Sequence, residues 1–192
     1  YGYKPNARFY FRNVLEELDS PGEYYLNRAT GTLYFWPPAP LEGTEVLVST
    51  LESPLTTLTD TSNIFIENIR LEGGRYCGAT VQGGAHSRIA GCTFANFGNF
   101  AANVSGGEDH AILGCDMFNL GDYGVNISGG DRITLTPAGH VAENNHIHHY
   151  GRMVRTYTPA FKINGVGNRI AHNLVHDAPH MGIGLGGNDH II

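Results

Sequence analysis

The sequence predicts an all-β fold, a parallel β-helix of about five rungs in which short strands stack on one another. The first observation is an apolar position that recurs at spacings of 23, 23, 30, 28 and 22 residues. Its members are Ile66, Ile89, Ile112, Ala142, Ile170 and Ile192. The second observation is a further strand in each repeat, with apolar centres at Val81, Val104, Ile127, Ile163 and Leu185. Two short strands in a period near 23 residues indicate a solenoid, not a sandwich or a βαβ fold.

Glycine usage and the usual handedness of crossovers add to this prediction. The chain has 26 glycines in 192 residues, about double the ordinary usage of ~7 %. They recur at strand ends, where tight corners need backbone conformations that glycine adopts freely. Crossover connections between parallel strands are right-handed almost without exception, so a right-handed helix is expected.

Residues 1–58 do not fit the repeat and are predicted to form a short non-repeating β segment in front of the β-helix over residues 59–192. The expected elements are a strand over Arg8–Leu15, a helical turn over Leu15–Leu18, a hairpin over Glu23–Trp36 and a strand over Glu45–Ser49. Gly31 suits the positive φ that the hairpin turn requires.

The ends and the charge of the chain limit the kinds of protein to which it can belong. It does not begin with Met, and it ends at Ile192 as a sixth rung begins, so we expect a piece of a longer protein. The net charge is −6, which argues against a nucleic-acid partner, because that needs a basic surface. No apolar run approaches the ~20 residues of a membrane span. The oligomeric state is left open.

Two repeats are longer than the others. The spacing of 30 exceeds 23 by 7 residues at Asp131–Ala138, and the spacing of 28 exceeds it by 5 around Gly151–Pro159. Insertions in solenoids form loops, often on the binding face. Consecutive insertions therefore predict the wall of a cleft.

The cysteines are expected to be reduced and buried. Cys92 and Cys115 each lie three residues after the repeated isoleucine, a place that Asn145 and Asn173 take in later rungs. Because rungs stack ~4.8 Å apart, these residues should form an interior ladder, with an amide ladder at its asparagine end.

The repeat also places polar side chains in columns, which together gather histidines and aspartates. One column contains Ala95, Phe118, His148 and His176, and the next contains Asn96, Asn119, His149 and Asp177. A third column contains Tyr76, Asn99, Asp122 and His180.

A glycosidase needs one protonated carboxyl group and one ionised carboxylate. Asp122 and Asp177 are the leading pair, and His149 and His180 are expected to orient or tune them. The alternative is that Asp177 and the histidines are ordinary turn and stacking residues.

The long repeat also supplies cations and an aromatic ring. A lyase that removes the proton next to a uronate carboxyl group needs a cation and a base, which Arg155 and Lys162 would supply. Tyr157 could stack on a sugar ring, and His148 and His176 are further candidates for substrate binding.

The hypothesis of a metal site starts from His146 and His148, which point the same way in a strand. With His176 below His148, a three-histidine zinc site is conceivable. Leu174 takes the place below His146 and weakens the hypothesis of a zinc site, so no metal and no cofactor is predicted.

Two segments carry a resemblance to a known family. They are RNVLEELDSPGEYYLNRATGTLYFWPP and GNRIAHNLVHDAPHMGIGLGGNDHII. Both resemble segments of right-handed parallel β-helix proteins of bacterial polysaccharide degradation, most closely glycoside hydrolase family 141 and its relatives. The resemblance implies a secreted or periplasmic glycoside hydrolase of a plant or algal polysaccharide. A uronate lyase and a non-catalytic carbohydrate-binding or surface solenoid remain alternatives.

Overall fold

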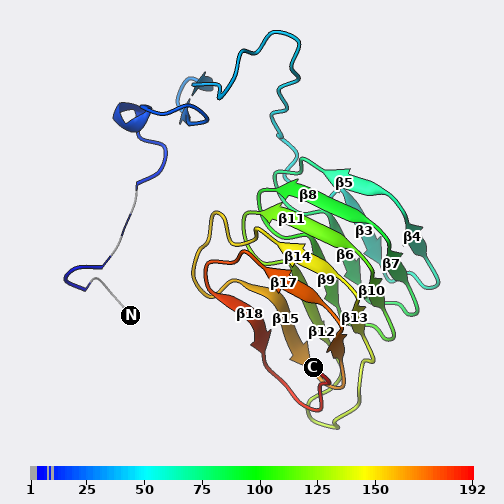
Figure 1. The fold of residues 1–192 in the computed structure, drawn as a ribbon. Coiled ribbons are helices and arrows are strands. Elements are labelled where there is room, and N and C mark those ends of the chain that lie inside the picture. The colour runs from blue at the N-terminus through cyan, green and yellow to red at the C-terminus, as the bar shows by residue number, and fades with distance from the viewer. Residues whose placement is uncertain (1–3, 8, 10) are drawn as a thin grey trace. The chain divides into compact units, whose positions relative to one another are not determined.

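The computed structural model describes residues 4–7, 9 and 11–192. The chain divides into two compact units, residues 1–47 and residues 48–192. The second unit is the solenoid, whose strands stack rung upon rung in Figure 1.

The first unit contains the predicted hairpin and helical turn. Strand β1 (Tyr24–Asn27) pairs antiparallel with β2 (Thr32–Phe35), and Tyr25 lies opposite Tyr34. A 3₁₀ turn, η1, covers Leu15–Glu17. Both elements confirm the sequence prediction.

Two strands expected in this region are wrong or lie partly outside the described residues. Arg8 and Tyr10 of the first are not described, and residues 11–14 form no strand. Residues 45–49 form no strand either. Val46, Leu47 and Val48 are exposed there, and β-propensity alone does not hold a segment extended without a partner strand.

The solenoid has three parallel sheets, one along each side. The first sheet consists of β4 (Phe65–Glu67), β7 (Arg88–Ala90), β10 (Ala111–Leu113), β13 (Val141–Glu143) and β16 (Arg169–Ala171). The second consists of β5 (Arg70–Glu72), β8 (Thr93–Phe97), β11 (Asp116–Leu120), β14 (His146–His148) and β17 (Leu174–His176). The third consists of β3 (Thr56–Thr59), β6 (Ala79–Gln82), β9 (Ala102–Ser105), β12 (Val125–Gly129), β15 (Pro159–Gly165) and β18 (Met181–Leu185).

Each full rung thus has three strands, not the two that the sequence predicts. The segment expected as one strand bends between the first and second sheets. The residues at this bend all have positive φ: Asn68, Gly91, Gly114, Asn144 and His172. Glycine and asparagine adopt this left-handed conformation at low cost, and one such residue turns the chain between two strands.

The predicted register is confirmed and forms the core. Ile89 lies beside Ile66 and Ile112 in the first sheet. Ile127 lies beside Val104 and Ile163 in the third. The side chains of Ile112, Ile127 and Ile163 are almost fully buried, so each rung covers the apolar residues of its neighbours.

The interior ladder is also confirmed. Asn145 Nδ2 donates to Asn173 Oδ1 at 3.0 Å, and Asn145 Oδ1 accepts the backbone N–H of Cys115 at 3.0 Å. Cys92 and Cys115 are buried free thiols, and burial raises the pKa of Cys115 to about 12. The asparagines therefore satisfy buried backbone groups that a purely apolar column would leave unpaired.

A second interior ladder lies between the third and first sheets. His110 Nδ1 accepts the backbone N–H of Ser87 at 3.1 Å, and His140 Nδ1 accepts that of His110 at 3.2 Å. Asn168 Oδ1 takes the same role for His140 at 3.1 Å, and His190 Nδ1 does so for Asn168. Each rung thus binds the next through one side-chain acceptor.

This ladder predicts that the free energy of unfolding falls in acid. Burial, together with neighbouring His110, lowers the pKa of His140 to about 4. The unfolded chain protonates its histidines near pH ~6.5, so stability is full above that value and falls as pH drops towards about 4. The loss from His140 is at most about 3 kcal/mol. Denaturant unfolding at several pH values measures it.

His140→Asn should flatten this part of the profile, because Asn168 already performs the same role in the next rung. His86→Asn, at an exposed corner with positive φ, is the matched control and should retain the wild-type profile. An identical slope in His140→Asn and wild type would contradict the assignment.

Candidate functional site

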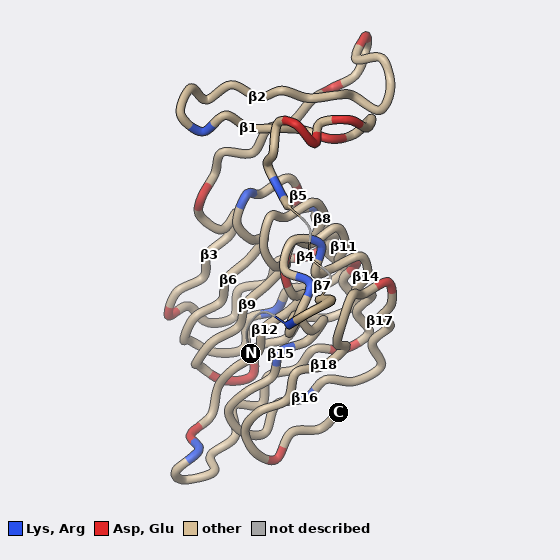
Figure 2. Tube along the Cα trace, turned by 90° about the vertical axis from the view of Figure 1, so that its left-hand side faces the viewer, with Lys and Arg blue, Asp and Glu red and all other residues tan. Residues whose placement is uncertain are grey.

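The two inserted loops lie at opposite edges of the third sheet. One follows β12 and leads to the first sheet, and its ends pair where Asp131 bridges Thr136. The other, residues 151–158, leads from β14 of the second sheet to β15 of the third. Figure 2 shows β3, β6, β9 and β12 side by side along this part of the solenoid. The two insertions therefore do not adjoin in one wall, and the strands of the third sheet lie between them.

The outer face of the third sheet is polar. Asn126 Nδ2 donates to Asn103 Oδ1 at 2.6 Å, and Thr80 and Thr57 share a hydrogen bond at 3.3 Å. Lys162 follows Asn126 in this column, because the two are register partners. Amides, hydroxyls and an ammonium group thus form one line across the rungs.

A shallow depression of about 240 Å³ lies on the last rungs of this face. Its lining comes from the inserted loop and the two final strands: Tyr157, Pro159, Lys162, Asn164, Met181 and Gly184–Gly186. Tyr157 is 66 % exposed, so much of its side chain faces solvent. Aromatic rings present a broad apolar surface and a polar tip, which suits a flat ligand with hydroxyl groups.

Asp122 lies between β11 of the second sheet and β12 of the third, and its side chain is partly buried. Burial raises the pKa of its carboxyl group, while the backbone N–H of Tyr123 and the ammonium group of Lys162 oppose the rise. A carboxyl group with a raised pKa next to an open face is a candidate general acid.

A second group of titratable side chains covers the outer face of the second sheet. His148 lies beside His176, as the sequence predicts, and their rings stack at 5.1 Å. His149 and Asp177 both have positive φ at the following corner, and His149 Nε2 lies 3.7 Å from Asp177 Oδ2. The predicted stacking order of these columns is confirmed.

Hydrogen-bonding contacts connect this group. His146 Nε2 lies 2.7 Å from His176 Nε2, and His148 Nδ1 lies 2.7 Å from His149 Nδ1. His176 Nδ1 lies 2.9 Å from Asp177 Oδ2. The hydrogen bond from His176 and the nearby His149 lower the pKa of Asp177, which keeps its carboxylate ionised.

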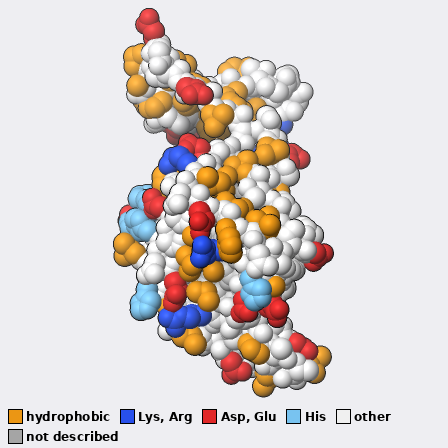
Figure 3. All heavy atoms as spheres, turned by 90° about the vertical axis from the view of Figure 1, so that its right-hand side faces the viewer, with side chains coloured by type: hydrophobic (Ala, Val, Ile, Leu, Met, Phe, Trp, Pro, Cys, Tyr) orange, Lys and Arg blue, Asp and Glu red, His pale blue; other side chains and the backbone are white. Residues whose placement is uncertain are grey.

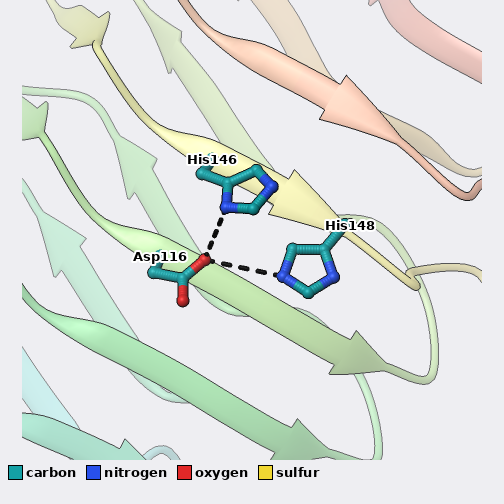
Figure 4. Close-up of side chains that lie close together, drawn as sticks. All are labelled: Asp116, His146 and His148. Atoms are coloured by element: carbon teal, nitrogen blue, oxygen red, sulfur yellow. Dashed lines mark ion pairs between the residues drawn. The ribbon is translucent and has the colours of Figure 1, made fainter.

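Sequence reasoning missed Asp116, which belongs to the same group. Its Oδ1 lies 3.0 Å from His146 Nδ1 and 3.6 Å from His148 Nε2, as Figure 4 shows. The signal was present in the register: Asp116 directly follows Cys115, and so takes the place of His146 in the preceding rung.

Other predicted site residues lie apart. Among the described residues, no hydrogen bond or ion pair joins Asp122 to Asp177 or to His180. His180 Nδ1 instead accepts the backbone N–H of Tyr157 at 3.0 Å, and the two rings meet edge to face. Arg155 is exposed on the inserted loop.

The first sheet offers a contrast. Arg169 and Glu143 pair at 2.6 Å, and Arg88 pairs with Glu67. Figure 3, which views this side, shows acidic side chains next to basic ones among apolar side chains. Its charges are paired locally, so the candidate chemistry concentrates on the other two sheets.

The position of Asp122 yields a measurable prediction. Its carboxyl group should titrate above its ordinary pKa, and Lys162→Met should raise that pKa further, because it removes the cation that stabilises the ionised form. Carbon-13 NMR of the aspartate carboxyl groups measures both values. Arg132→Met, on the other inserted loop, is the control and should leave Asp122 unchanged. An Asp122 that titrates at or below the ordinary value contradicts its burial.

The part of the chain that the structure describes contains no helix with the length and apolar character of a membrane span.

Comparisons with known proteins bear on the fold. No curated protein and no solved structure matches the chain. A family model described as "right handed beta helix region" matches residues 55–192. This range covers every strand of the three stacked sheets, and the chain belongs to the right-handed β-helix family.

Proposed function

We propose that the chain is a carbohydrate-active β-helix that binds a polysaccharide across the outer face of the third sheet and hydrolyses it. The observation that carries the proposal is the depression beside the inserted loop, which combines exposed Tyr157, the ammonium group of Lys162 and the amide of Asn164. An aromatic platform with a few convergent polar groups is the common form of a site for a polar organic ligand.

The polymer suits the solenoid because both are repetitive. Amides and hydroxyls recur on the strands of the third sheet from β3 to β15, as Asn103 and Asn126 illustrate. A chain of sugars presents hydroxyl groups at similarly regular intervals, so several rungs can donate and accept hydrogen bonds at once. The net charge of −6 favours a sugar polymer over a phosphate polymer.

Two carboxyl groups with opposite environments supply the chemistry. Asp122, with its raised pKa, would protonate the glycosidic oxygen as the bond to the anomeric carbon breaks. Asp177, held ionised by His176, would take a proton from the water that attacks that carbon. His149 would help to keep Asp177 ionised, and His180 would position the inserted loop through Tyr157.

The spacing of the rungs favours inversion over retention. Asp122 follows β11, and Asp177 follows β17, two rungs further along the second sheet. Two rung steps separate the two residues by roughly 10 Å along the solenoid axis, and they lie in different columns, so their backbones are at least that far apart. This suits the ~6.5–9.5 Å between carboxyl groups of inverting enzymes better than the ~5 Å of retaining ones.

The resemblance to glycoside hydrolase family 141 supports the same proposal, and with it a secreted or periplasmic location and a plant or algal polysaccharide as substrate. Arg155, His148 and His176 would contact further sugar or uronate groups.

The test is an activity screen on plant and algal polysaccharides that follows reducing ends and the ultraviolet absorbance of unsaturated uronates together. Reducing ends without the absorbance are expected, and proton NMR should show an inverted anomer. Asp122→Asn and Asp177→Asn should each lose about 10²–10⁴-fold in kcat. Asp109→Asn, an exposed corner carboxylate beside His86, should retain full activity.

Three outcomes would overturn parts of this proposal. Full activity in Asp122→Asn and Asp177→Asn would remove their assigned roles. Absorbance that disappears in Lys162→Met would establish a lyase, with Lys162 as base and Arg155 as the neutralising cation. Saturable binding without cleavage would leave a carbohydrate-binding solenoid.

Tyr157→Ala should weaken oligosaccharide binding about 3- to 10-fold, because a stacked ring contributes ~0.5–1.5 kcal/mol. Tyr24→Ala, an equally exposed tyrosine of the hairpin (60 % against 66 %), is the matched control. Calorimetric titration measures both. Equal affinity in the two variants would show that the sugar does not lie on this part of the face.

A further inference from the structure

We propose that Asp116, His146 and His148 form a binding site for a divalent transition-metal ion of the zinc type on the outer face of the second sheet. Their donor atoms, Asp116 Oδ1, His146 Nδ1 and His148 Nε2, all lie within 4.8 Å of one another (Figure 4). The inference goes beyond the proposed hydrolase activity: the three ligands lie on the second sheet, although His148 is also proposed above to contact sugar.

The distances suit a tetrahedral ion. Ligands that each lie ~2.0–2.1 Å from zinc in a tetrahedral site are about 3.3 Å apart. Asp116 Oδ1 lies 3.0 Å from His146 Nδ1 and 3.6 Å from His148 Nε2. The backbone enforces this proximity. His146 and His148 are two residues apart on one strand and so point the same way, and Asp116 is the register partner of His146.

The state of the Asp116 carboxylate points to a cation. Its Oδ1 atom is shielded from solvent and has no hydrogen-bond partner, although two imidazole nitrogens face it. Neither ring therefore directs an N–H group at this oxygen in hydrogen-bonding geometry. A buried carboxylate oxygen without a donor calls for an explanation, and a bound ion is one of the few available.

The surrounding histidines hold the two ligands in the required tautomers. If His146 binds the ion through Nδ1, its proton is on Nε2 and can be donated to His176 Nε2, 2.7 Å away. The proton of His176 is then on Nδ1, which faces Asp177 Oδ2 at 2.9 Å. Each ring nitrogen in this series therefore faces the metal ion, a donor or an acceptor that matches its protonation.

The series of hydrogen-bonding contacts that starts at the second ligand has the same form. If His148 binds through Nε2, its Nδ1 proton can be donated to His149 Nδ1 at 2.7 Å. The proton of His149 is then on Nε2, which faces Asp177 Oδ2 at 3.7 Å. Both ligands thus connect to one carboxylate, and carboxylate-linked histidines are the usual outer shell of a metal site.

The donor set selects the type of ion. Two imidazoles and one carboxylate suit zinc and its first-row neighbours, whereas calcium and magnesium prefer oxygen ligands. Three protein ligands leave a fourth position for water or a ligand, as in zinc sites that are not purely structural.

The test uses the untagged full chain and zinc alone. Calorimetric titration and elemental analysis after gel filtration should give one zinc per chain, unaffected by millimolar calcium or magnesium. Asp116→Asn and His148→Gln should weaken binding at least tenfold. His176→Gln, which removes only an outer partner, should weaken it about 10–100-fold without abolishing it. Circular dichroism checks that each variant is folded.

The chain offers a matched control in His86 and Asp109, an exposed histidine–aspartate pair 3.7 Å apart with no third donor beside it in the described structure. His86→Gln and Asp109→Asn should leave zinc affinity unchanged. Cobalt bound to the wild-type chain should give the visible absorption of a four-coordinate ion. Substoichiometric zinc, no cobalt spectrum, or equal affinity in wild type, Asp116→Asn and His148→Gln would each overturn the proposal. Hydrolase activity enters none of these readouts, so either proposal can fail without the other.

Discussion

The in-register stacking of parallel rungs is the constraint on which the rest of the structure depends. Backbone hydrogen bonds hold neighbouring strands ~4.8 Å apart, and register partners such as Ile89 and Ile112 face the same way. Any residue type that recurs at one repeat position therefore becomes a continuous column. Inside the solenoid most columns are apolar, and each rung is covered only when its neighbours are present. Outside, the same rule turns single polar residues into extended polar surfaces.

Stacking has different consequences at interior and exterior positions. Inside, His110, His140 and Asn168 accept backbone N–H groups of adjacent rungs, so polar side chains act as connectors between layers. Burial lowers the pKa of His140 and keeps it neutral, because the charged form loses its hydration. Outside, His148 and His176 stack in the same manner but remain near solvent.

The two candidate surfaces lie on neighbouring sheets and share a border. The depression on the third sheet is built by the insertion that follows β14, and β14 itself carries His146 and His148 of the histidine group. His180 extends this connection, since it contacts Tyr157 of the inserted loop. This arrangement places the proposed polysaccharide-binding face and the proposed metal site on adjoining sheets of the same rungs.

The sequence by itself determined the repeat, the core columns, the register and the hairpin. These follow from periodicity, since a fixed spacing that places apolar residues in line admits one stacking order. It also predicted that His148 stacks on His176. Only the tertiary structure decided that each rung has three strands, because single left-handed corner residues such as Asn144 bend the chain without altering its period. The tertiary structure alone set the partly buried environment of Asp122, in which Lys162 acts electrostatically, and directed His180 to Tyr157. Those contacts depend on corner geometry and side-chain torsions, which a spacing along the chain does not encode.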